Sequence, residues 1–265
     1  GDRQKVKSLD CFIFDIETIP DIDFGRRMWN LDGLSDAEIA TAMTFMRQQQ
    51  TGSEFLPPHA HRVAAISVAF RTGDRFRVWS LGDRESDEAD IIRRFFEGIE
   101  RHSPELVSWN GNGFDLPVLH YRALKNGIQA PRYWETGAVD REFRYNNYLS
   151  RYHWRHLDLM DVLSGFQNHG RASLDQMAIM LGFPGKLGMS GDKVWQCWLD
   201  GGIDDIRNYC ETDVLNTYLV YLRFQFMRGN LDDAGLKAEY DLVRSQLLEY
   251  DKPHLNEFLT AWQAD

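Results

Sequence analysis

Short apolar runs separated by turn residues recur along the chain, and this pattern is typical of buried β-strands. Two of the runs are joined by Thr72-Gly73-Asp74, which predicts a β-hairpin. We expect five strands, at residues 10–16, 63–70, 75–80, 106–109 and 156–158.

Apolar residues spaced three and four apart predict amphipathic helices, most clearly over residues 86–101. Ser35-Asp-Ala-Glu38 has the form of a capping box and predicts a helix at 36–50, which Pro57-Pro58 ends. We therefore regard 24–60 as an insertion-like helical segment. Further helices are expected at 115–126, 173–182, 203–227, 235–250 and after Pro253.

This order of elements predicts the fold class. Three strands, two of them joined as a hairpin, followed by alternating strands and helices indicate an α/β fold with a mixed five-stranded sheet and helices on both faces. The chain of 265 residues contains no internal repeat and no linker rich in proline, glycine or serine. We expect one domain over residues 1–265.

Composition limits the protein class. Hydrophobic residues make up 43% of the chain, which is ordinary for a globular protein, and no apolar run approaches the roughly 20 residues of a membrane span. There is no signal peptide, and Cys11, Cys197 and Cys210 show no pairing pattern, so we expect a reduced, cytoplasmic protein without membrane contact.

The net charge of −10 argues against broad, non-specific binding to nucleic-acid duplexes. Residues 232–265, with eight acids and three bases, supply half of that charge. A carboxylate cluster whose charge is offset by metal ions would account for more of it. The charge therefore does not exclude a nucleic-acid substrate.

Asp15 and Glu17 are two carboxylates, two residues apart, inside an apolar run that is predicted to be a strand. Side chains alternate along a strand, so both acids should point to the same face. Two like charges on a buried strand are unfavourable unless a cation or a proton offsets them. The pair therefore predicts a metal site, unlike the other Asp-x-Glu triplets, which lie in polar surroundings at Asp36/Glu38, Asp83/Glu85 and Asp140/Glu142.

Three further residues fit the same chemistry. Asp115 follows the glycine-bearing turn 110–113, where capping the next helix is an equally good interpretation. Tyr209 and Asp213 share one face of a predicted helix, although a packed tyrosine beside a solvated aspartate is a common alternative. Four carboxylates can hold two divalent ions that act on a phosphodiester, and oxygen ligands suit Mg²⁺ or Mn²⁺.

The three segments together resemble a known set of motifs. Phe14-Asp-Ile-Glu-Thr18, Asn110-x-x-x-Phe-Asp-Leu-Pro117 and Tyr209-Cys-x-x-Asp213 are similar, in order and spacing, to the three exonuclease motifs of the proofreading domain of family-B DNA polymerases. The resemblance implies the DEDD superfamily of 3′–5′ exonucleases, tyrosine subtype, with a ribonuclease-H-like fold. Because no polymerase palm follows the motifs, we expect a stand-alone relative of that domain, similar to the predicted polymerase-B-like exonucleases of bacteria.

The resemblance also implies residue roles. The histidine subtype would place a histidine where this chain has Asn208. The motifs imply an exonuclease core over 10–222, with 24–60 as the insertion and 228–265 as a helical C-terminal extension. The implied metal ligands are Asp15, Glu17, Asp115 and Asp213, and the implied water-positioning residue is Tyr209.

Some substrate contacts can be suggested around these motifs. The backbone N–H of Thr18 could bind the terminal nucleotide, and Asn110 and Phe114 could contact its sugar or base. For the latter two, a turn-stabilising asparagine and a core phenylalanine are equally good interpretations. Asp158 and Asp161 could support the metal ligands, but we favour solvated acids.

Two segments outside the motifs have a composition suited to a substrate. Residues 131–156 interleave arginines with aromatic residues, which is typical either of a single-strand-binding surface or of core aromatics beside solvated arginines. The loop 185–193 is glycine-rich and mildly basic, and could close over a substrate.

The sequence thus predicts a metal-dependent 3′–5′ exonuclease that uses two Mg²⁺ or Mn²⁺ ions on single-stranded nucleic acid, with DNA favoured. The alternatives are a 3′–5′ exoribonuclease, because nothing in the motifs reveals how the site treats a 2′-hydroxyl, and a catalytically silent nucleic-acid-binding module.

Overall fold

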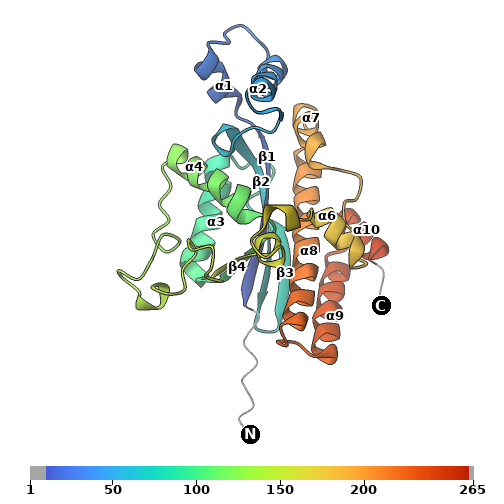
Figure 1. Ribbon diagram of the computed structural model, residues 1–265. Helices are drawn as coiled ribbons and strands as arrows, with labels where there is room; N and C mark the ends of the chain where they lie inside the picture. Colours follow the sequence, from blue (N-terminus) through green and yellow to red (C-terminus); the bar gives the residue numbers. More distant parts are fainter. Residues whose placement is uncertain (1–9, 263–265) are drawn as a thin grey trace.

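The computed structural model describes residues 10–262, and one mixed sheet lies at its centre (Figure 1). The strand order is β3-β2-β1-β4-β5. β1 pairs antiparallel with β2, as β2 does with β3, whereas β1–β4 and β4–β5 are parallel. This confirms the predicted mixed five-stranded sheet. The strands are β1 Cys11–Pro20, β2 His61–Thr72, β3 Arg75–Ser80, β4 Glu105–Ser108 and β5 His156–Asp158.

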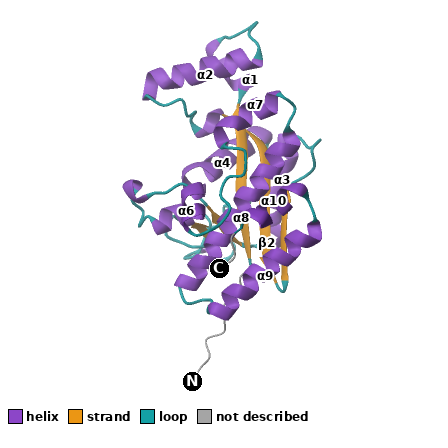
Figure 2. Ribbon diagram, turned by 90° about the vertical axis from the view of Figure 1, so that its right-hand side faces the viewer, coloured by secondary structure: helices purple, strands orange, loops and turns teal. Residues whose placement is uncertain are grey.

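Helices cover both faces of this sheet, as predicted (Figures 1 and 2). α1, α5 and α7 were not expected from the sequence. No helix within residues 10–262 is long and apolar enough to cross a bilayer. The helices are α1 Ile22–Trp29, α2 Asp36–Thr51, α3 Glu88–His102, α4 Leu116–Asn126, α5 Leu159–Leu163, α6 Leu174–Met180, α7 Val194–Leu199, α8 Ile203–Met227, α9 Asp233–Tyr250 and α10 Pro253–Ala261.

β1 shows how the two faces are divided. Cys11 and Ile13 belong to the core that packs against α8, α9 and α10. Phe12 and Phe14, which alternate with them, belong to the core against α3 and α4. Continuing this alternation places Asp15 and Glu17 on the α8 face.

The C-terminal extension predicted at 228–265 completes the core on the α8 face. Val243 and Leu247 of α9 and Leu255 and Phe258 of α10 are fully buried there. The last three residues of the extension lie outside the described part of the chain.

The segment 24–60 forms most of a small helical unit at one end of the sheet (Figure 1). The predicted capping box is present, because the Ser35 side chain accepts from the Glu38 N–H while the Glu38 carboxylate accepts from the Ser35 N–H. Ile39 and Met43 of α2 pack with Leu56 in a separate small core. This unit therefore has its own packing and returns the chain to β2.

Candidate active site

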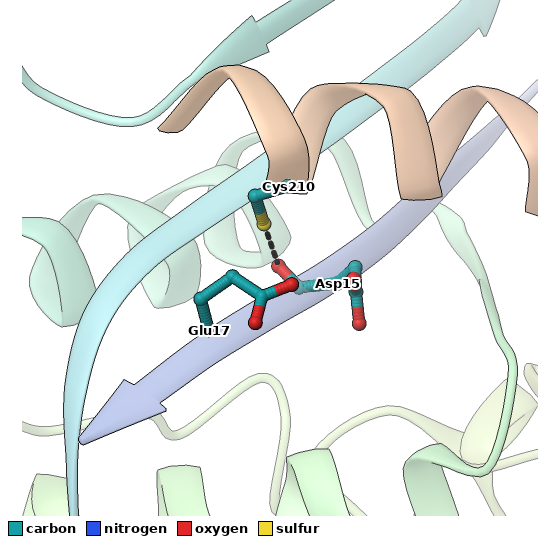
Figure 3. Close-up of side chains that lie close together, drawn as sticks. All are labelled: Asp15, Glu17 and Cys210. Carbon is teal, nitrogen blue, oxygen red and sulfur yellow. Dashed lines mark hydrogen bonds between the residues drawn. The ribbon is translucent and has the colours of Figure 1, made fainter. Parts of the chain in front are cut away.

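Asp15 and Glu17 lie side by side on β1 beneath α8 (Figure 3). Their carboxylates and the thiol of Cys210 lie within 4.8 Å of one another. The strand is irregular here, because the pairing with β2 shifts between Glu17 and Thr18 and leaves Ala64 unpaired. Such a bulge bends the strand, and bulges are frequent next to active sites.

Asp115 reaches this cluster from a tight turn after β4. Gly111–Asp115 form a π-helical turn that runs directly into α4. A side chain at Gly111 would collide with Ser108, so this turn requires glycine there. Asp115 makes no capping bond to α4, contrary to the interpretation as a helix cap. Its carboxylate is buried, and its Oδ2 atom has no hydrogen-bond partner.

α8 supplies Tyr209 and Asp213, one helical turn apart. This helix packs across β1 and β2, so both residues face the acids of β1. The hydroxyl of Tyr209 lies within hydrogen-bonding reach of the Asp213 carboxylate, and Tyr209 is buried. Three separate elements thus bring together the four carboxylates and the tyrosine that the motifs singled out.

The pKa values of these acids report a crowded, desolvated site. Burial raises the pKa of Asp15 well above its usual value, and the carboxylates of Asp115 and Glu17 raise it further. Burial, followed by the charges of Asp213 and Asp115, does the same to the pKa of Glu17. Burial also raises the pKa of Asp115 and of Asp213 to about 7. The cluster therefore resists carrying four negative charges unless a cation or a proton offsets them.

Lys186 is a basic residue whose charge reaches the cluster. It lies in the loop after α6, and its charge lowers the pKa of Asp213 and Glu17 against the effect of burial. The sequence indicated this loop only as flexible and basic. Nothing local distinguished Lys186 from Lys193, which lies in the same loop.

The interpretation of Asp158 and Asp161 as solvated acids is wrong. Both are buried, with exposed fractions of 3% and 2%. Asp158 accepts from the backbone N–H groups of Asn110 and Asn112, at 2.9 and 3.1 Å, and so holds the turn that carries Asp115. Asp161 forms an ion pair with Arg151. Both acids are satisfied by partners distant in sequence, which a local pattern cannot reveal.

The three suggested substrate contacts all lie near the acids. Thr18 follows the strand irregularity, and its hydroxyl bonds to Nδ1 of His61 at 2.8 Å. Asn110 has a left-handed backbone with φ of 67° and opens the π-helical turn. Phe114 is half-buried, and its ring packs against those of His61 and Phe55. Their contact with a substrate stays a prediction.

The aromatic residues of 131–156 are divided between the core and the surface. Tyr133, Phe143 and Tyr148 are buried in the core against α3 and α4. Tyr145 and Tyr152 are exposed. The segment is therefore only partly available to a ligand.

The sheet order and the helices on both faces of the sheet agree with the predicted α/β, ribonuclease-H-like fold, and the acids gather on its α8 face. Residues 53–262, more than half of the chain, match the family described as "Predicted 3'-5' exonuclease related to the exonuclease domain of PolB". The chain belongs to this family. The matched residues include Asp115, Tyr209 and Asp213, whereas Asp15 and Glu17 precede them.

The curated relatives are archaeal DNA polymerases. DNA polymerase 1 of Pyrococcus abyssi is 24% identical over 92% of this chain and 33% of its own length. The DNA polymerase of Pyrococcus glycovorans is 25% identical over 69% of this chain and 25% of its own. This chain therefore spans a quarter to a third of these relatives.

A solved structure, the family B DNA polymerase of Pyrobaculum calidifontis, matches 91% of this chain and 29% of its own, with 20% identity and a TM-score of 0.48.

Proposed function

We propose that this protein is a 3′–5′ exonuclease that requires divalent metal ions and hydrolyses phosphodiester bonds at single-stranded 3′ ends. The observation that carries the proposal is the convergence of four carboxylates from β1, the π-helical turn and α8. Their raised pKa values mean that the cluster favours a positive partner. Membership of a family of predicted 3′–5′ exonucleases supports the same reaction.

The donor set fits hard divalent cations. Asp115 Oδ2 is buried without a hydrogen-bond partner, so a bound cation would satisfy an oxygen that the protein leaves unpaired. Asp15, Glu17, Asp115 and Asp213 would hold two Mg²⁺ or Mn²⁺ ions through oxygen atoms alone. The thiol of Cys210 is not expected to join them, because burial raises its pKa and it donates a hydrogen bond to the Asp15 carbonyl (Figure 3).

Different residues of the site would then have different roles in hydrolysis. When bound, the ions would supply a water nucleophile of lowered pKa and stabilise charge on the attacking and leaving oxygens. Tyr209 would orient the attacking water. Burial and the charge of Asp213 raise the pKa of its hydroxyl, so it stays protonated and cannot serve as a base. Lys186 would offset charge on the cluster and on the phosphate.

A DNA substrate is favoured because the curated relatives are named DNA polymerases. The negative net charge of the chain suits a site that engages an end rather than a long duplex. We therefore propose single-stranded DNA as the substrate.

The test compares wild type with Asp213→Asn on 5′-labelled DNA and RNA oligonucleotides of matched sequence. Wild type should shorten the DNA in Mn²⁺ and not in chelator, and the variant should lose at least a thousandfold in rate, because a proposed metal ligand is lost. Glu249→Gln, an exposed acid on α9, is the matched control and should keep the wild-type rate. Equal rates for Asp213→Asn and wild type would exclude the proposal, and faster cleavage of the RNA would reassign the substrate.

A further inference from the structure

Phe55 is a large apolar side chain held in solvent in the helical insertion, between α2 and β2. Its side chain is 60% exposed, and it belongs to none of the hydrophobic cores described above. Its backbone is nevertheless fixed, because its N–H donates to Ser53 Oγ at 3.2 Å and its carbonyl accepts from Arg47 Nε at 3.0 Å. The ring is therefore presented to solvent by a hydrogen-bonded backbone.

Two other rings join Phe55 in what we call the aromatic ledge, formed by Phe55, His61 and Phe114. The Phe55 centroid lies 5.5 Å from that of Phe114 and 5.4 Å from that of His61. Phe114 meets His61 edge-on at 5.0 Å. Such distances are typical of attractive aromatic contacts, so the three rings pack as one cluster in which Phe55 is the exposed member.

The aromatic ledge is joined to the segments that carry the acids through two of its members. Phe114 immediately precedes Asp115 in the π-helical turn. His61 binds the hydroxyl of Thr18, the residue that follows Glu17. His61 is itself buried, and burial lowers its pKa, so this ring supports the two phenylalanines as a neutral group at neutral pH. The exposed ring of Phe55 is therefore packed on Phe114 and His61, which belong to or contact the segments that carry the proposed ligands.

We propose that Phe55 stacks against a base near the 3′ end of the strand being cut. This inference rests on the proposed exonuclease function. It gives a role to the helical insertion, which places an exposed ring against Phe114, the residue that precedes the proposed ligand Asp115. A chain with a net charge of −10 gains little from non-specific phosphate attraction. Stacking, which every base allows, offers another source of affinity for a single strand.

Phe45 provides a matched control. It lies on α2 in the same insertion, is 62% exposed, and makes no ring contact among the described residues 10–262. Phe45→Ala therefore removes the same amount of exposed aromatic surface away from the aromatic ledge. Because both phenylalanines are largely exposed, neither substitution should unfold the protein, and thermal melting checks this.

The experiment measures kcat and KM for Phe55→Ala, Phe55→Trp and Phe45→Ala on a 5′-labelled single-stranded DNA in Mn²⁺. Phe55→Ala should raise KM roughly 5- to 150-fold with little change in kcat, because a base contact is kept from the ground state to the transition state. Phe55→Trp and Phe45→Ala should stay near wild type. On an oligonucleotide whose last three nucleotides lack bases, wild type and Phe55→Ala should have equal KM values.

Two results would overturn the inference: a wild-type KM for Phe55→Ala on the normal strand, or a penalty that persists on the abasic strand. Fluorescence anisotropy with both oligonucleotides separates this inference from the function it rests on. If wild type cleaves nothing but still binds the normal strand 5- to 150-fold more tightly than Phe55→Ala does, the function is wrong and the stacking role stands. If binding is equal too, both fail.

Discussion

Replacing Asp15 by asparagine should make the metal-free protein more stable and the metal-bound protein less stable. The pKa of Asp15 is raised well above its ordinary value of 3.8, first by burial and then by the charges of its neighbours. The folded protein therefore retains a proton that the unfolded chain loses. The stability that this neutral acid contributes is complete below about pH 4 and is lost as the pH rises through the raised pKa.

The magnitude follows from linkage. A carboxyl group that keeps its proton only in the folded state lowers the free energy of unfolding by about 1.4 kcal/mol per pH unit. Asparagine does not titrate, so in chelator the advantage of Asp15→Asn should grow by at most about 3 kcal/mol between pH 5 and pH 7. For a chain of this size, that corresponds to a rise in Tm of about 6–12 °C relative to wild type.

Bound metal ions should instead make wild type more stable than Asp15→Asn. A ligand at a hundred times its Kd that binds only the folded state adds about 2.7 kcal/mol to the stability of wild type. Asp15→Asn should lose most of that gain together with catalysis, because the oxygen that it replaces is a proposed ligand. Thermal melts at pH 5, 6 and 7, with chelator or with MnCl₂, measure both effects, and Glu249→Gln serves as the control. A variant that is less stable than wild type in chelator at every pH, yet equally stabilised by Mn²⁺, would refute the reasoning.

Three further substitutions probe the same site. Tyr209→Phe should lower kcat about 100-fold, because a misplaced reacting group costs about that much in rate. This loss is smaller than the one expected for Asp213→Asn, and an equal loss would show that the tyrosine does more than orient the water. Cys210→Ser should keep the rate in Mn²⁺, because the thiol donates to a backbone carbonyl that the serine hydroxyl can also reach, and loss of Mn²⁺ binding in calorimetry would instead make it a ligand. Lys186→Met should raise the pKa of Asp213 and Glu17 further, and so shift the acidic limb of the pH–rate profile to higher pH; an unchanged profile would show that its charge does not act on the cluster.

The sequence was informative where a local pattern and a chemical anomaly coincided. Asp15 and Glu17 could be singled out because an apolar strand surrounds them, and the structure does place them together beneath α8. The end of this strand was harder to predict. The apolar pattern predicts a strand at 10–16, whereas β1 runs to Pro20. Polar residues interrupt the apolar run in its second half. Backbone pairing with β2 supplies what the pattern lacked.

Contacts between distant segments account for the errors. α1 was missed because Gly25 and two arginines interrupt its apolar spacing, yet Gly25 is needed there, since a side chain would collide with Met43 of α2. Asp158 was taken as solvated because its partners, the backbone N–H groups after β4, lie nearly fifty positions earlier in the chain. Such residues become recognisable only when the strands are assembled.

The direction and metal dependence of cleavage test the central claim most directly. A single-stranded DNA labelled at its 5′ end should give a ladder of products that shorten one nucleotide at a time in Mn²⁺. A phosphorothioate at the last 3′ linkage should slow this ladder, the same change at the first 5′ linkage should not, and chelator should abolish it. Immediate release of the labelled 5′ nucleotide, or an undiminished ladder in chelator, would contradict the account of a metal-dependent 3′–5′ exonuclease.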